Sequence, residues 1–227
     1  AVDAEHKLIV AHEVTNAPID RHQLAAMSKR AQKAVKSEAL TVLADRGYYK
    51  GEEIRECYLA GIKALVPKSF TSNSKAAGLF DKEDFIYDAR ADQYHCPAGE
   101  TLPRRYSSVE NGLTIHTYYA SVLACRDCKL RDKCTKSKER RVRRWEHEGL
   151  LDAMAEELRQ TPDAMPMRAR TVEHPFGTIK TWMGSQHFLM KQLKNVRTEM
   201  SLHVLAYNLK RMISIKGVIP LMEAMRA

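Results

Sequence analysis

The sequence predicts a mixed α/β fold that contains parallel strands. Short apolar runs typical of strands alternate with segments of helical apolar spacing over residues 1–67, and helical spacing returns after residue 149. Strands that alternate with helices are joined by crossovers, and crossovers produce parallel pairing. A chain of 227 residues is long enough to bury a sizeable core, in one domain with an insertion or in two domains.

Residues 1–67 carry the clearest alternation. Asp3 reads as a turn residue before an apolar run, so a hairpin is expected whose first strand is mostly missing. Gly61 marks the end of a helix, and Pro67 ends the last strand. The expected elements are a strand at 8–14, a helix at 20–37, a strand at 40–44, a helix at 51–60 and a strand at 62–66.

Residues 68–148 differ in character, and we expect them to form a cysteine-rich insertion. Ser and Asn are frequent at 69–74, aromatic residues are scattered, and four of the five cysteines gather here. The segment ends in a basic run, Lys129 to Arg144, with nine Lys or Arg against two acids. This run is either a DNA-contacting surface together with Trp145 or a solvated helix face.

Residues 149–227 are expected to form a helical part of the core. Helices are predicted at 150–159, at 168–183 despite Pro175, and at 196–215. The last of these is expected to pack against the sheet through one apolar side. That side would consist of Val196, Met200, Leu205, Leu209, Met212 and Ile213.

Charge favours a polyanionic partner. Lys and Arg outnumber Asp and Glu by 37 to 28, which gives a net charge of +9 and a pI near 9.3. A basic surface attracts nucleic acid because neutralising phosphates releases condensed counterions. No apolar run approaches the roughly 18 residues that cross a bilayer, and no export signal is present, so a cytoplasmic location is expected.

Two acidic residues are candidates for catalysis. Asp45 follows an apolar strand and precedes Gly47, a position at which open α/β sheets bind ligands, although it could also cap the following helix. Glu173 lies on a predicted helix, where an ion pair with Arg170 is the simpler interpretation.

Taken together, two stretches resemble the DDE transposases of bacterial insertion sequences. They are Ala44-Asp45-Arg46-Gly47-Tyr48-Tyr49 and Arg170-Thr171-Val172-Glu173, the latter followed by Phe176-Gly177 and Lys180. The opening Ala1–His12, the cysteine-rich insertion before Glu173 and the closing Leu205–Arg211 extend the resemblance over essentially the whole chain. The resemblance implies a ribonuclease-H-like mixed sheet with flanking helices.

The resemblance also implies roles for single residues. Asp45 resembles the second catalytic aspartate of the family and Glu173 its glutamate. Lys180 matches the lysine of the family's Tyr-Arg-Glu-Lys signature, in which Pro166 replaces the tyrosine. The phosphate-contacting arginine is either Arg168 or Arg170, because Ala169 occupies its place.

The implied chemistry is cleavage and strand transfer of double-stranded DNA at transposon ends and target. Mg²⁺ or Mn²⁺ held by Asp45 and Glu173 would serve as cofactor, and a homodimer in a synaptic complex is the expected assembly. The first aspartate of the family lies on the strand before the opening hairpin. Because the chain begins at Ala1 without Met, it reads as a C-terminal fragment that is inactive alone. The alternatives are an inactive DNA-binding remnant and a nuclease of the same fold.

The cysteines predict a second metal. Four of them have the spacing C-x28-C-x2-C-x5-C, which suits a tetrahedral structural Zn²⁺ site. The alternative is four reduced cysteines or occasional disulfides, and His95 could replace one ligand. Cys57, on a predicted helix, is expected to be a small core residue. The four candidate ligands are Cys96, Cys125, Cys128 and Cys134.

Overall fold

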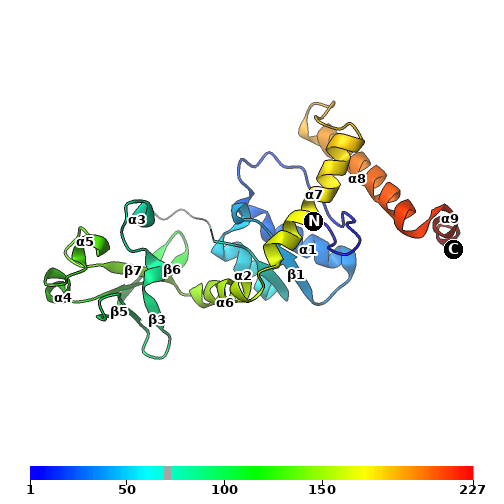
Figure 1. The fold of residues 1–227 in the computed structure, drawn as a ribbon. Coiled ribbons are helices and arrows are strands. Elements are labelled where there is room, and N and C mark those ends of the chain that lie inside the picture. The colour runs from blue at the N-terminus through cyan, green and yellow to red at the C-terminus, as the bar shows by residue number, and fades with distance from the viewer. Residues whose placement is uncertain (69–72, 227) are drawn as a thin grey trace. The chain divides into compact units, whose positions relative to one another are not determined.

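The computed structural model describes residues 1–68 and 73–226. They divide into two compact units (Figure 1): unit 1 contains residues 1–68 and 151–226, and unit 2 contains residues 73–150. Both helices and strands are present, with parallel pairing in unit 1 and antiparallel pairing in unit 2. The mixed α/β class predicted from the sequence is confirmed. None of the described helices is both long and apolar enough to cross a membrane.

Unit 1 is built around a parallel pair of strands. Leu40 pairs with Ile62 and Leu43 with Leu65, so the two strands have the parallel register expected from a β-α-β connection. The elements of its first part are η1 (Asp20–His22), α1 (Leu24–Val35), β1 (Leu40–Leu43), η2 (Arg46–Tyr48), α2 (Gly51–Leu59) and β2 (Ile62–Leu65). These bounds confirm the predicted helices and the two predicted strands between residues 20 and 66.

The predicted strand at 8–14 is wrong in extent. The described residues form only an isolated antiparallel bridge there, between Val2 and Ile9. Asp3 lies in the turn between them, and its carboxylate accepts hydrogen bonds from the backbone of Glu5 and His6. The hairpin and the turn role of Asp3 are therefore present, without a regular strand after it.

The second part of unit 1 is helical. Its elements are α6 (Glu148–Gln160), which begins in unit 2, α7 (Ala164–Gly177), the π-helix η4 (Thr178–Trp182), α8 (Leu193–Lys216) and α9 (Val218–Ala224). Pro175 is buried inside α7 and has no N–H to donate, and wider π-type bonding follows it, including Met183 N–H to Thr178 O at 3.0 Å. The helix predicted at 168–183 is thus continuous, but it changes from α-helical to π-helical hydrogen bonding after Gly177.

The expected apolar side of the long helix packs only near its first turns, where Val196 and Met200 are partly buried. In α8 the buried residues are Val204 and Tyr207, whereas Leu205 is 64% exposed and Leu209 45% exposed. Tyr207 and Asn208 face the N-terminal hairpin, where they bond to the backbone of Lys7 and Ile9. Polar contacts with this hairpin therefore decide which side of α8 faces the protein.

The core of unit 1 lies between the two strands and their helices. Cys57 is fully buried there, as predicted, next to Ile54 of α2. Met154 of α6 and Ala164 of α7 join the same core from the distant second part of the chain. Burial of these side chains ties the two parts of unit 1 together.

Unit 2 is a five-stranded antiparallel sheet in the order β3-β4-β5-β6-β7. Its strands are β3 (Ile86–Asp88), β4 (Gln93–His95), β5 (Thr101–Glu110), β6 (Leu113–Tyr119) and β7 (Arg141–Trp145). Its helices are α3 (Asn73–Ala76), η3 (Lys82–Asp84), α4 (Val122–Arg126) and α5 (Arg131–Cys134). The alternative of a helix face for the basic run is wrong for Arg141–Trp145, which is a strand.

Candidate functional site

Asp45 lies immediately beyond β1, at the carboxyl end of the parallel pair. Ala44 N–H still donates to Leu65 O (3.2 Å), and the chain then turns into η2. The Asp45 carboxylate caps that turn, since Gly47 N–H donates to its Oδ1 (2.9 Å). A Cβ at position 47 would lie 3.0 Å from this oxygen, so glycine permits the close approach.

The other oxygen of Asp45 binds an arginine from a distant part of the chain. Arg168 of α7 donates from Nη2 to Asp45 Oδ2 at 2.7 Å. The Asp45 side chain is 47% exposed and that of Arg168 25% exposed, so solvent reaches the pair. The structure thus brings together Asp45 and Arg168, two of the predicted site residues.

Glu173 lies on the same helix as Arg168, five residues later, and its side chain is exposed. Five residues correspond to about 140° of rotation around an α-helix, so Glu173 points to a different side of α7 from the residue that contacts Asp45. The structure gives no contact between the two predicted catalytic carboxylates among the described residues. Their sharing of one site stays a prediction.

The two other predicted phosphate contacts are also exposed. Arg170 is exposed on α7, and Lys180 lies in η4 with its Nζ 5.8 Å from the centre of the Phe176 ring. A nearby groove of about 220 Å³ adds positive charge, because Lys210 and Arg211 of α8 line it with His174 and Trp182. Arg170, Lys180 and Lys210 face solvent, as phosphate contacts require.

A cavity of about 290 Å³ lies beside Asp45. Ala44, Tyr48 and Arg168 line it, together with apolar residues of α1, α7 and the N-terminal hairpin. Burial raises the pKa of Tyr48, the Asp20 and Asp45 carboxylates add to this, and Arg168 opposes it. The pair of Asp45 and Arg168 therefore sits between open solvent and a largely apolar hollow.

The donor atoms at this end of β1 have the right chemistry for Mg²⁺, since carboxylate oxygens are its preferred protein ligands. Their arrangement is incomplete. Within residues 1–68 and 73–226 no three His, Cys, Asp or Glu side chains are grouped closely enough to hold a metal ion. The cation beside the Asp45 carboxylate is the Arg168 guanidinium.

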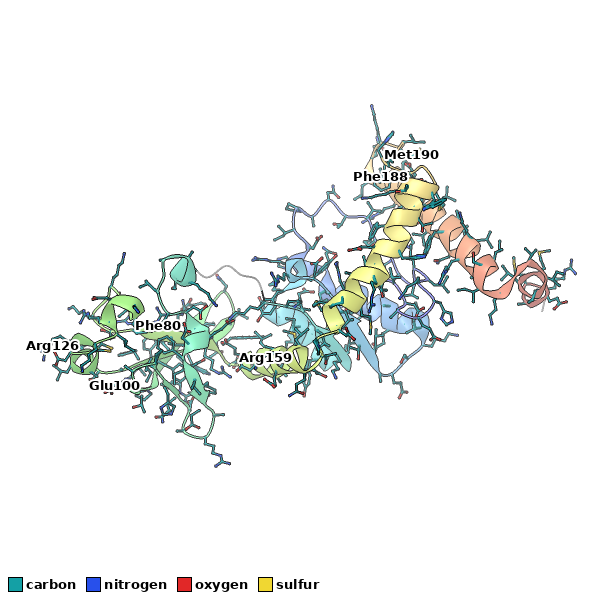
Figure 2. The ribbon with its side chains drawn as sticks, in the orientation of Figure 1. Phe80, Glu100, Arg126, Arg159, Phe188 and Met190 are labelled. Atoms are coloured by element: carbon teal, nitrogen blue, oxygen red, sulfur yellow. The ribbon has the colours of Figure 1, made fainter. Side chains whose placement is uncertain are left out.

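The four clustered cysteines meet in unit 2, although their segments are separate in sequence. Cys96 follows β4, Cys125 lies in α4, Cys128 follows that helix, and Cys134 ends α5. All four line one cavity of about 30 Å³, and Phe80 and Glu100, labelled in Figure 2, line it too. His95, the alternative ligand, does not line this cavity.

The thiols are close enough to affect one another. Burial raises the pKa of the Cys134 thiol, the nearby Arg140 guanidinium opposes this, and the thiols of Cys125, Cys96 and Cys128 raise it further. All four are free cysteines.

Two features of the structure were not predicted from the sequence. Asp45 and Arg168 are separated by 123 positions, and no local pattern indicates that they pair. The second is the sheet of unit 2, for which the Asn111-Gly112 pair was a sequence signal of a hairpin. In the structure both residues have positive φ (50° and 80°) at the turn between β5 and β6. Asn-Gly is the strongest short hairpin signal.

The comparisons with known proteins gave one match. The family model described as "Transposase DDE domain" matches residues 95–213, just over half of the chain. The matched region includes the four clustered cysteines, Arg168, Glu173 and Lys180, and begins after Asp45. Comparisons with curated proteins and with solved structures found no match.

Proposed function

Because the chain belongs to the transposase DDE domain family, we propose that it takes part in metal-dependent cleavage and strand transfer at the ends of an insertion sequence. The observation that carries this proposal for the chain's own residues is the place of Asp45. Its carboxylate stands at the carboxyl end of a parallel strand, half exposed and already bound to a cation.

We propose that Asp45 exchanges partners during function. The Arg168 guanidinium occupies the place that a divalent cation, Mg²⁺ or Mn²⁺, would take beside Oδ2. When bound, such a metal supplies positive charge that stabilises a phosphodiester under attack. Arg168, released from Asp45, would then be free to contact a DNA phosphate, the role predicted for it from the sequence.

Glu173 is proposed as the second carboxylate of the site. Its present direction, about 140° around α7 from Arg168, means that α7 must turn or shift before both carboxylates face one substrate. The buried Pro175 and the π-helical turns that follow lie two residues or more beyond Glu173, where the helix has lost regular α bonding. We infer that DNA binding repositions this part of α7.

Double-stranded DNA, as transposon ends and as target, is the proposed substrate. Arg168, Arg170 and Lys180 would contact phosphates, which positions a strand without reading its sequence. A homodimer would pair two ends in a synaptic complex, and the cytoplasm of a bacterial cell is the proposed location. Zn²⁺, the second metal predicted from the sequence, concerns unit 2 and is independent of this chemistry.

The test is cleavage, by the full-length protein, of labelled duplexes that carry the ends of the element encoding it, with and without Mg²⁺. The expected result is nicking that Asp45→Asn and Glu173→Gln each reduce by at least about 10³-fold, because each change removes a carboxylate charge needed in the transition state. Glu157→Gln, which changes a partly buried carboxylate of α6 that pairs with Lys63, is the matched control and should retain activity. Normal cutting by both site variants would overturn the assignment.

A nuclease of the same fold is the second candidate, because the residues proposed here could cleave without joining. A pre-cleaved end supplied with a target plasmid separates the two functions. Joined product supports a transposase, and cleavage without joining supports the nuclease. An inactive DNA-binding remnant would bind the ends and do neither.

A further inference from the structure

We propose that the cavity lined by the four cysteines of unit 2 is a structural Zn²⁺ site with four thiolate ligands. The cysteines come from three separate places: the turn after β4, the α4 segment with its following turn, and the end of α5. This inference rests on unit 2 alone and does not depend on DNA cleavage. Its four ligands are Cys96, Cys125, Cys128 and Cys134.

The size and lining of the cavity suit one ion. A volume of about 30 Å³ is roughly twice what a single water molecule requires. Apart from the thiols, the lining is largely apolar or cationic, and Glu100 is its only carboxylate among the described residues. Soft sulfur donors select Zn²⁺ over Mg²⁺, which prefers oxygen.

Two arginines beside the cavity complement a tetrathiolate site. Zn²⁺ with four thiolates carries two negative charges, and Arg131 and Arg140 supply two positive ones. Each also holds the backbone of a ligand, since Arg131 Nη1 donates to Cys125 O (3.4 Å) and Arg140 Nη1 donates to Cys134 O (3.2 Å). Groups that orient ligands in this way commonly support metal affinity.

The backbone around two ligands has the geometry of metal-binding turns. Leu130 N–H donates to Cys128 Sγ at 3.4 Å, which fixes the turn around this sulfur. The turn after Cys96 closes through Gly99 N–H to Cys96 O at 2.9 Å, with Gly99 at φ +85°. Both turns carry a cysteine that lines the cavity shared by the four residues.

The surrounding structure needs a cross-link. Helices α4 and α5 have five and four residues, far fewer than an isolated helix needs for stability. Cys96, Cys125 and Cys134 pack at the rim of the small core of unit 2, while both helices lack fully buried residues of their own. Metal binding at this point would contribute directly to the folding free energy.

Ligation places each sulfur about 2.3 Å from the ion. As the described side chains stand, no three candidate ligands are grouped that tightly. A cysteine side chain has one rotatable bond before its sulfur, so ligation would require a change of χ1 rotamer, which free cysteines permit.

The first experiment measures zinc in the whole chain purified without a chelator or a histidine tag. About one zinc per chain is expected. Cys128→Ser and Cys134→Ser should each lower the content to a small fraction of that value. Cys57→Ala, which changes the cysteine buried in unit 1, is the matched control and should keep one zinc per chain. Zinc well below one in the unchanged protein, or equal loss in the control, would overturn the site.

A second measurement covers the case in which the serine variants fail to fold. Co²⁺ titrated into the chelator-treated, unchanged chain should give the visible bands of tetrahedral thiolate coordination and protect four thiols from alkylation. Arg140→Met, which keeps all four thiols, should weaken Co²⁺ binding by roughly 10- to 100-fold. An octahedral Co²⁺ spectrum, or disulfides among these cysteines by mass spectrometry, would contradict the inference.

Discussion

At the scale of single residues, the environment of Asp45 is the clearest link between sequence and chemistry. The residue types around it predicted its place, because an apolar strand followed by Asp and a nearby Gly positions a carboxylate at a strand end. Arg168 could not be predicted as its partner, since the contact depends on how α7 packs near β1.

The pair of Asp45 and Arg168 should matter more for function than for stability. Arg168→Ala is expected to lower the free energy of unfolding by up to about 1 kcal/mol, because the pair is open to solvent. Arg170→Ala, two residues away and exposed, should change it by less than about 0.5 kcal/mol. Urea unfolding followed by circular dichroism compares them, and a loss well above 2 kcal/mol for Arg168→Ala would contradict a surface pair.

Asp92 in unit 2 has the opposite character. It accepts hydrogen bonds from the hydroxyls of Tyr118 (2.6 Å) and Tyr87 (2.8 Å) and pairs with Arg104. Burial opposes ionisation, but these hydrogen bonds lower the pKa of Asp92 below its usual value. Asp92→Asn should destabilise unit 2 by about 1–2 kcal/mol, allowing for partial exposure.

The lowered pKa of Asp92 fixes the pH dependence of this effect. The stability that the carboxylate adds is present above its unfolded pKa, about 4, and is lost as pH falls through the lower folded value. Near-ultraviolet dichroism of the tyrosines during thermal unfolding measures it. Asp132→Asn, at an exposed position of the same unit, is the control with no expected change. A difference between wild type and Asp92→Asn that persists at pH 2 would argue against the mechanism.

At the scale of elements, the spacing of apolar residues predicted the helices and strands that bury one face in a core. Helices α1 and α2 and strands β1 and β2 agree with the expected ranges because their apolar residues all serve one core. The strands of unit 2 were missed because β5 is exposed along most of its length and shows no clean alternation. The packed side of the later turns of α8 was mispredicted because Tyr207 and Asn208 are held there by hydrogen bonds as well as by packing.

Those hydrogen bonds make Asn208 a strong anchor for α8. Its side chain accepts from Ile9 N–H and donates to Ile9 O, both at 2.9 Å, as a neighbouring strand would. Asn208→Ala should cost about 1–3 kcal/mol by leaving two backbone groups unsatisfied. Asn195→Ala, which removes only an exposed bond to Lys191 O within the same region, is the matched change and should cost much less. Hydrogen exchange at Ile9 reports the difference, and unchanged protection there would refute the anchoring role.

The contact between α7 and α8 should weaken in mild acid. Burial lowers the pKa of His174, Arg211 and Lys7 lower it further, and its Nδ1 lies 2.9 Å from the Tyr207 hydroxyl. The neutral form is therefore favoured on folding, so the stability is present above the unfolded pKa of about 6.5 and is lost as pH falls below it. Amide exchange in α8, corrected for its intrinsic pH dependence, should rise between pH 7 and pH 5 in the unchanged chain and less in His174→Gln. Equal rises would contradict this account.

At the scale of the whole molecule, the excess of positive charge sets how DNA binding responds to salt. With a net charge of +9, contacts to six or more phosphates are expected to lower affinity by about 10³-fold or more between 50 and 200 mM salt. Fluorescence anisotropy with duplexes of unrelated sequence measures the slope. An affinity that hardly changes with salt would indicate that phosphate contacts are few.

The change of helix type after Pro175 has a consequence for counting along the chain. In an unbroken α-helix, Glu173 and Lys180 would stand almost one above the other, two turns apart. Each i→i+5 bond in η4 takes up an additional residue per turn, so side chains beyond Gly177 lag in angular phase behind that ideal. In a related sequence, a Glu and a Lys seven positions apart would therefore point in the same relative directions as Glu173 and Lys180 only if that chain also forms π-helical turns between them.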